Sequence, residues 1–65
     1  MNWDQIKGKW KETSGAVKSK WGELSDEEIA RMDGARETLE GKIQSKYGKT
    51  KEQAKQEVND FLNAL

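Results

Sequence analysis

Three consecutive carboxylates, Asp26, Glu27 and Glu28, are the first candidates for a reactive or metal-binding site. Neighbouring carboxylates can perform acid–base catalysis or hold a calcium ion. However, the chain has no D-x-D/N-x-D/N-G calcium loop, and the triplet follows Ser25, a residue type that begins helices. Acids in the first turn of a helix stabilise the helix dipole. We therefore interpret the triplet as the start of a helix.

Three lysines, Lys7, Lys9 and Lys11, surround Trp10 and suggest a second kind of chemistry. Lysines can contact phosphates while an aromatic ring stacks on a nucleic-acid base. Trp10 falls on the apolar stripe of its predicted helix, however, and the chain has a net charge of zero. Proteins that bind nucleic acids normally carry a basic excess on one face. We therefore predict that Trp10 is a core residue and that no nucleic acid is bound specifically.

Two glycine–lysine pairs, Gly8-Lys9 and Gly41-Lys42, resemble fragments of a phosphate-binding loop. Neither pair follows a strand pattern or completes the motif. The chain has no cysteine and no histidine, which removes the thiolate nucleophile, cysteine–zinc sites and the usual general base near neutral pH. We predict a protein that is not an enzyme, with no catalytic, metal-binding or cofactor-binding residue and no cofactor.

The composition predicts one small domain that spans residues 1–65. Only 32% of the residues are hydrophobic, so nearly all the large ones must be buried. No stretch approaches the roughly 18 apolar residues of a membrane span, and the N-terminus lacks the apolar core of a signal peptide. We expect a cytoplasmic monomer. Much of the burial is expected from the five aromatic residues, Trp3, Trp10, Trp21, Tyr47 and Phe61.

The balanced net charge conceals a pattern along the chain. Residues 1–24 carry a net charge of +2, residues 25–40 carry −4, and residues 41–65 carry +2. The acidic middle could face the basic flanks, or the charges could form a solvated mixed surface.

An internal repeat is the strongest pattern in the sequence. Residues 15–22 and 41–48 share the pattern G-x-V/I-x-S-K-W/Y-G at an offset of 26 residues. The similarity extends back to residues 6–8 and 32–34, so the pseudo-repeat covers residues 6–22 and 32–48. The chain is therefore predicted to contain two related helical halves.

The first of four predicted helices begins at Asn2 and ends at Gly22. Asn2 and Gln5 form a capping box, and Met1 and Ile6 stand at the positions of a hydrophobic staple. We expect a kink or break at residues 13–15, and Gly22 is suited to a left-handed C-terminal position. The apolar stripe of this helix comprises Trp3, Ile6, Trp10, Val17, Trp21 and Leu24.

Residues that begin and end helices predict the other three helices. Ser25 and Glu28 form a capping box at the start of the second helix, and Asp33-Gly34 is its predicted end, although a kinked continuation through Gly34 stays open. The third helix carries its apolar face from Ala35 to Tyr47 and ends at Gly48. The fourth is capped by Thr50 with Gln53, and its apolar face comprises Ala54, Val58, Phe61, Leu62 and Leu65.

The glycines allow three interpretations. Gly8, Gly15 and Gly41 lie far from the apolar stripes, although a glycine inside a helix costs about 0.5–1 kcal/mol relative to alanine. They could permit a close helix–helix contact, be tolerated by solvent, or form a groove for an outside partner. The first interpretation predicts that Gly41→Ala destabilises the fold by overpacking, and this is the outcome we expect.

The sequence resembles the CsbD-like family of small bacterial stress-response proteins. The resemblance covers nearly the whole chain and departs from the family in the short tail after Phe61. It implies a compact four-helix, all-α domain in the bacterial cytoplasm that is abundant under general stress, with no established reaction. The matching segments are Gly8-Lys9-Trp10-Lys11, residues 15–22, residues 24–28, residues 41–44 and 46–48, Lys51-Glu52, Ala54, Glu57-Val58 and Phe61.

Two hypotheses for the function remain from the sequence. In the first, the protein is a structural or protective stress-response protein that acts through its hydrated, charge-dense surface. In the second, it is a small interaction module that docks on a protein partner, or less readily on a nucleic acid, through the acidic second helix or the glycine faces. The sequence does not identify such a partner.

Overall fold

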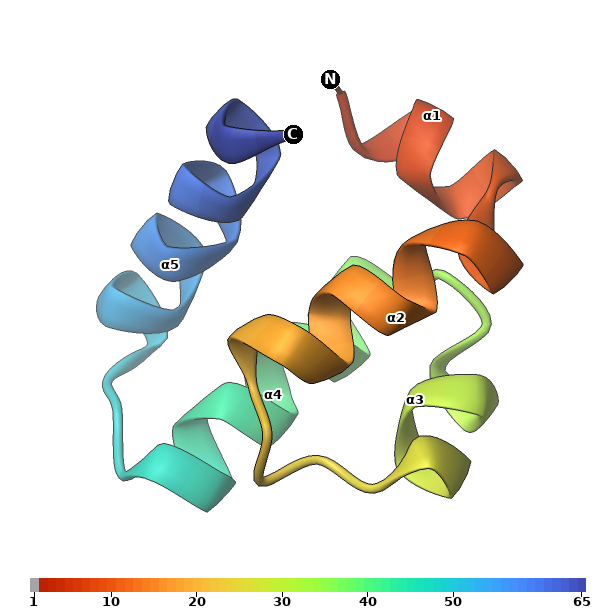
Figure 1. The fold of residues 1–65 in the computed structure, drawn as a ribbon. Helices are drawn as coiled ribbons and strands as arrows, with labels where there is room; N and C mark the ends of the chain where they lie inside the picture. Colours follow the sequence, from red (N-terminus) through yellow and green to blue (C-terminus); the bar gives the residue numbers. More distant parts are fainter. Residues whose placement is uncertain (1) are drawn as a thin grey trace.

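The structure, a computed structural model, describes residues 2–65 of the chain. The fold of these residues is built from helices. Within these residues there are five helices and no strand (Figure 1). The all-α prediction is confirmed, and the predicted number of four helices is wrong. The helices are α1 (Trp3–Gly8), α2 (Trp10–Lys20), α3 (Asp26–Met32), α4 (Arg36–Tyr47) and α5 (Lys51–Ala64).

The additional helix arises from a break at Lys9, one turn before the break expected at residues 13–15. Lys9 has φ −118° and ψ 35°, and its amide donates to the carbonyls of both Gln5 and Ile6. The Thr13 hydroxyl lies 3.0 Å from the Lys9 carbonyl oxygen and 3.2 Å from that of Ile6, so it provides a donor where the helical ladder is interrupted. Thr13 is thus a buried bridge across the break.

The break matches the internal repeat. Lys9 lies 26 residues before Ala35, which separates α3 from α4. Shifted by 26 residues, the bounds of α2 become 36–46, and α4 spans Arg36–Tyr47. The repeat therefore describes two helix pairs, α1–α2 and α3–α4, followed by α5.

All three predicted capping boxes are present. In each, the side chain of the first residue accepts from the backbone amide three positions later, whose own side chain accepts from the cap amide. These paired bonds satisfy amides that the helix itself leaves without partners. The pairs are Asn2 with Gln5, Ser25 with Glu28, and Thr50 with Gln53. The staple predicted for Met1 lies outside the described residues.

The predicted helix stops are confirmed at two places and wrong at a third. Asp33 and Gly34 have φ values of 47° and 79°, so α3 ends there and does not continue through Gly34. Gly48 has φ 64° and closes α4. Gly22 does not adopt the predicted left-handed conformation, because α2 already ends at Lys20 and Trp21 is its C-cap, with φ −121°.

A single cluster of thirteen buried hydrophobic residues forms the core. In Figure 1, α2 and α4 lie between α5 on one side and α3 on the other. Trp21, 1% exposed, packs against Phe61 of α5 with ring centroids 5.1 Å apart. The core comprises Ile6, Trp10, Val17, Trp21, Leu24, Ile29, Met32, Leu39, Ile43, Ala54, Val58, Phe61 and Leu62.

The close-contact interpretation of the glycines is wrong. A Cβ atom built on Gly8, Gly15 or Gly41 would meet no other atom within 4 Å, apart from its chain neighbours and its own helix backbone. No second helix approaches these positions, so the overpacking expected for Gly41→Ala does not arise. Gly34 is different, because it is buried and its added methyl would lie 2.7 Å from Cγ of Lys7 and 3.1 Å from its Cα.

Gly41→Ala is therefore expected to stabilise the protein by about 0.4–1 kcal/mol, because alanine restricts the unfolded chain and fits helical geometry. Gly34→Ala is the contrasting variant and should destabilise the protein. The backbone at Gly34 has a φ of +79°, which alanine rarely adopts, and the added methyl would collide with Lys7. Thermal melts of both variants measure the difference, with an increase of roughly 2–8 °C expected for Gly41→Ala. A lower melting temperature for Gly41→Ala would contradict this account.

Candidate functional site: a groove between α2 and α3

The acidic triplet does not form one site. Glu28 belongs to the capping box of α3, where its Oε1 accepts from the Ser25 amide at 3.3 Å. The same carboxylate lies 3.3 Å from the Lys42 ammonium and 3.2 Å from that of Lys46, both on α4. The interpretation of the triplet as a helix start is confirmed. At Glu28 the acidic middle of the chain also faces a basic flank, as the charge pattern allowed.

These contacts change the acidity of Glu28. The hydrogen bond from the Ser25 backbone amide, followed by those from Lys46 and Lys42, lowers the pKa of the Glu28 carboxyl from 4.5 to about 2. Each of them stabilises the ionised carboxylate. The lowered pKa therefore reflects a structural link between α3 and α4.

The prediction that Trp10 is a core residue is confirmed. Its side chain is 9% exposed, and its indole Nε1 donates to the Ile29 carbonyl at 2.9 Å. The ring is thus held between α2 and α3 and is not available to stack on a base. Lys7, Lys9 and Lys11 are exposed around it.

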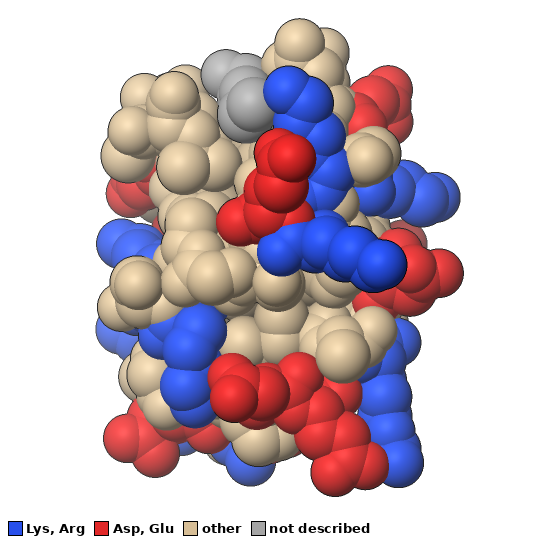
Figure 2. Space-filling model, turned by 45° about the vertical axis from the view of Figure 1, so that its right-hand side comes forward, with Lys and Arg blue, Asp and Glu red and all other residues tan. Residues whose placement is uncertain are grey.

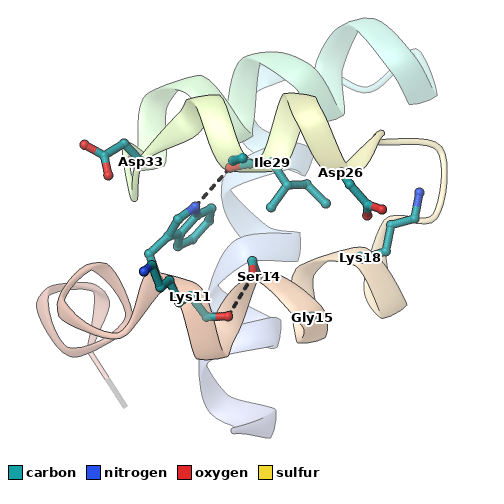
Figure 3. A pocket seen from close by; sticks show the side chains of 9 residues that line it. Lys11, Ser14, Gly15, Lys18, Asp26, Ile29 and Asp33 are labelled. Atoms are coloured by element: carbon teal, nitrogen blue, oxygen red, sulfur yellow. Dashed lines mark hydrogen bonds between the residues drawn. The ribbon is translucent and has the colours of Figure 1, made fainter.

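A groove lies between α2 and α3 and has a volume of about 480 Å³ (Figure 3). Pockets for small ligands usually measure about 300–1,000 Å³ and combine apolar surface with a few polar groups. The floor of this groove is lined by Trp10, Ile29 and Ala30, with Ser14 and Gly15 on the α2 side. Ala30 is exposed, whereas Trp10 is 9% and Ile29 is 2% exposed. Gly15 lines it without a side chain, and a methyl group there would enter open space.

The polar groups on the floor already have partners within the protein. The indole Nε1 of Trp10 is bonded to Ile29, and the Ser14 hydroxyl donates to the Lys11 carbonyl at 3.0 Å (Figure 3). The middle of the groove therefore offers an apolar surface with no hydrogen bond left to satisfy.

Charged residues stand at both ends of the groove. Lys18 and Asp26 lie at one end, and Lys11 and Asp33 lie at the other (Figure 3). Among residues 2–65, no ion pair joins either lysine to either aspartate within 4 Å. The Lys18 ammonium instead donates to the carbonyl of Leu24 at 2.6 Å. The two walls thus carry opposite charges across an open space.

The sequence did not predict this groove as one site. It identified the acidic helix and the glycines separately, and Asp26 and Gly15 prove to line the same groove. The usable signal in the sequence was Gly15, a glycine inside a predicted helix and far from its apolar stripe. Gly41, its counterpart in the repeat, is equally exposed but is not among the residues that line the groove.

Metal ligands do not gather in the structure as described. Residues 2–65 contain no group of three or more His, Cys, Asp or Glu side chains placed to hold a metal ion. Across the same residues, we find no helix whose length and apolar character would allow it to cross a membrane.

The fold and the groove define a small all-α protein with two related helix pairs, a C-terminal helix and a charge-balanced surface. The CsbD-like family model matches residues 4–56, which is most of the chain. The chain belongs to the CsbD-like family, as its sequence suggested.

Relatives of similar length support this assignment. The UPF0337 protein PA4738 of Pseudomonas aeruginosa is 51% identical over 65 residues, which cover 100% of both chains. The UPF0337 protein pc0632 of Protochlamydia amoebophila is 52% identical over 61 residues, covering 94% of this chain and 92% of the relative. The UPF0337 protein YjbJ of Escherichia coli K12 is 46% identical over 61 residues, covering 94% and 88%. No solved structure gives a significant match.

The lowered pKa of Glu28 predicts the acid sensitivity of the fold. The pKa of Glu28 is about 2 in the folded protein and about 4.5 in the unfolded chain. Ionised Glu28 therefore stabilises the fold fully above pH 4.5. This contribution is lost as the pH falls toward 2. In Glu28→Gln, which retains a capping side chain but not the charge, the urea midpoint should be lower at pH 7 and should change less between pH 4.5 and 2.

Glu27→Gln is the matched control, because Glu27 precedes Glu28 in the same helix turn and its ion pair with Arg31 is solvent-exposed, with the Glu27 side chain 71% exposed, and so contributes little. Its pH profile should stay close to that of the wild type. If Glu28→Gln and the wild type lost stability in parallel between pH 4.5 and 2, the proposed role of Glu28 would be refuted.

Proposed function

We propose that this CsbD-like chain is a general stress-response protein of the bacterial cytoplasm, with a structural or protective role and no catalytic activity. The family membership supports the link to stress, which is what the resemblance of the sequence implies. The names of its relatives specify no reaction. The character of the surface supports protection as the mode of action.

The observation that carries the proposal is the dense and evenly mixed charge of the surface. The chain has 12 basic and 12 acidic residues, and on the face shown in Figure 2 the two kinds alternate over the surface. Leu65 is the one large hydrophobic residue exposed among those described. Mixed, patch-free charged surfaces stay hydrated and resist association, so such a protein can separate other macromolecules as water is lost.

The chemistry of the side chains supports a role without catalysis. The chain lacks cysteine and histidine, and the lowered pKa of Glu28 comes from its cap and its two lysines. The buried acid, Glu40, is paired with Arg36 at 2.7 Å, as expected of a structural ion pair.

Protection can be measured by drying lactate dehydrogenase with the protein and assaying its activity after rehydration. We expect the wild type to preserve more activity than an equal mass of ubiquitin. A variant with glutamine at four exposed positions should protect less while melting within a few degrees of the wild type. The positions are Lys20, Glu37, Lys51 and Glu52, which keep the net charge at zero.

Equal preservation by ubiquitin and by the wild type would refute the protective role. Equal protection by the glutamine variant would refute the contribution of surface charge.

A further inference from the structure

The floor of the groove between α2 and α3 restricts the kinds of ligand that the groove can bind. The Trp10 indole and the Ser14 hydroxyl already donate to the carbonyls of Ile29 and Lys11, so a polar ligand would lose its own hydration there without gaining new bonds. The middle of a ligand must therefore be apolar, to cover the exposed Ala30 and the small part of Trp10 that reaches the surface, since Ile29 is only 2% exposed. Polar recognition is left to the charged residues at the two ends.

The spacing of those charged residues sets the length of the ligand. Lys11 and Lys18 are seven residues apart on α2, and Asp26 and Asp33 are seven residues apart along α3 and its C-cap. At about 1.5 Å per residue, each pair is separated by roughly 10 Å along its helix. An extended peptide spans about 3.3–3.6 Å per residue, so about three residues reach from one end of the groove to the other.

The charges at the ends set the chemistry of the ligand. Because α2 and α3 run in opposite directions along the groove, each end has one lysine and one aspartate (Figure 3). The Lys18 ammonium is already bonded to the Leu24 and Gly22 carbonyls, so its end can receive an ammonium group at Asp26, and the other end can receive a carboxylate at Lys11. A zwitterion with its two charges about 10 Å apart matches both ends at once.

We propose that the α2–α3 groove is a binding site for short apolar peptides of about three residues with free ammonium and carboxylate ends. The apolar side chains cover Ala30, Gly15 and the exposed part of Trp10. The peptide termini pair with Asp26 at one end and Lys11 at the other. Gly15 is the residue that keeps the groove open, because any side chain there would occupy the peptide's space. The proposal is independent of the protective role of the surface.

An NMR titration of the full chain with the tripeptide Leu-Ala-Leu tests this proposal. We expect saturable chemical-shift changes at the Trp10 indole and at the amides of Gly15 and Ala30. The same peptide with an acetylated N-terminus and an amidated C-terminus should bind about tenfold more weakly, because it lacks both terminal charges. Asp26→Asn combined with Asp33→Asn should weaken binding of the free tripeptide several-fold, because these changes keep side-chain shape but remove the charge.

Gly15→Leu should abolish binding by filling the groove, and Gly41→Leu is its matched control, since both glycines are exposed inside helices. The proposal is overturned if the tripeptide causes no saturable shifts in the wild type. It is also overturned if Gly15→Leu, shown to be folded by circular dichroism, binds as the wild type does. Equal affinity for the free and the blocked peptide, or tighter binding of a blocked amphipathic helix, would instead indicate a surface for a protein partner.

Discussion

The contact between Trp21 and Phe61 joins the end of α2 to the C-terminal helix α5. Trp21 stands at the end of α2, 1% exposed, with its ring 5.1 Å from that of Phe61. Its indole Nε1 donates to the Glu57 carboxylate at 3.1 Å, and that carboxylate also pairs with Lys49 at 3.6 Å. A chain in which 32% of the residues are hydrophobic has few such contacts, and a small domain depends heavily on each.

The groove likewise depends on the small number of large side chains in this sequence. Trp10 holds α2 beside α3 through its bond to the Ile29 carbonyl, which fixes the two helices on either side of the ring. Beyond Trp10, the facing positions carry small residues, Ser14 and Gly15 on α2 and Ala30 on α3, so the space is not filled. A buried tryptophan and small neighbours together give a groove with an apolar floor and charged ends.

The sequence predicted most features that depend on neighbouring residues, with the left-handed conformation expected at Gly22 as an exception. The three capping boxes and the stop at Gly48 are local, and they were predicted correctly. The break at Lys9 was missed because Lys9 is neither glycine nor proline. It accompanies long-range bonds, from Trp10 to Ile29 and from Trp3 to the Gly34 carbonyl. The repeat could have located it, since the predicted stop at Gly34 has Gly8 as its counterpart. The groove depends on how α2 packs against α3, which no helical spacing specifies.

Urea unfolding of Trp21→Ala, followed by circular dichroism, tests most directly whether this contact sustains the fold. Truncating a buried aromatic residue usually costs about 3–5 kcal/mol, which is most of the stability of a domain of this size. The variant should be largely unfolded in water or unfold at a much lower urea concentration than the wild type. Trp21→Phe, which keeps an aromatic ring without the bond to Glu57, should lose much less. An unchanged midpoint for Trp21→Ala would contradict the account.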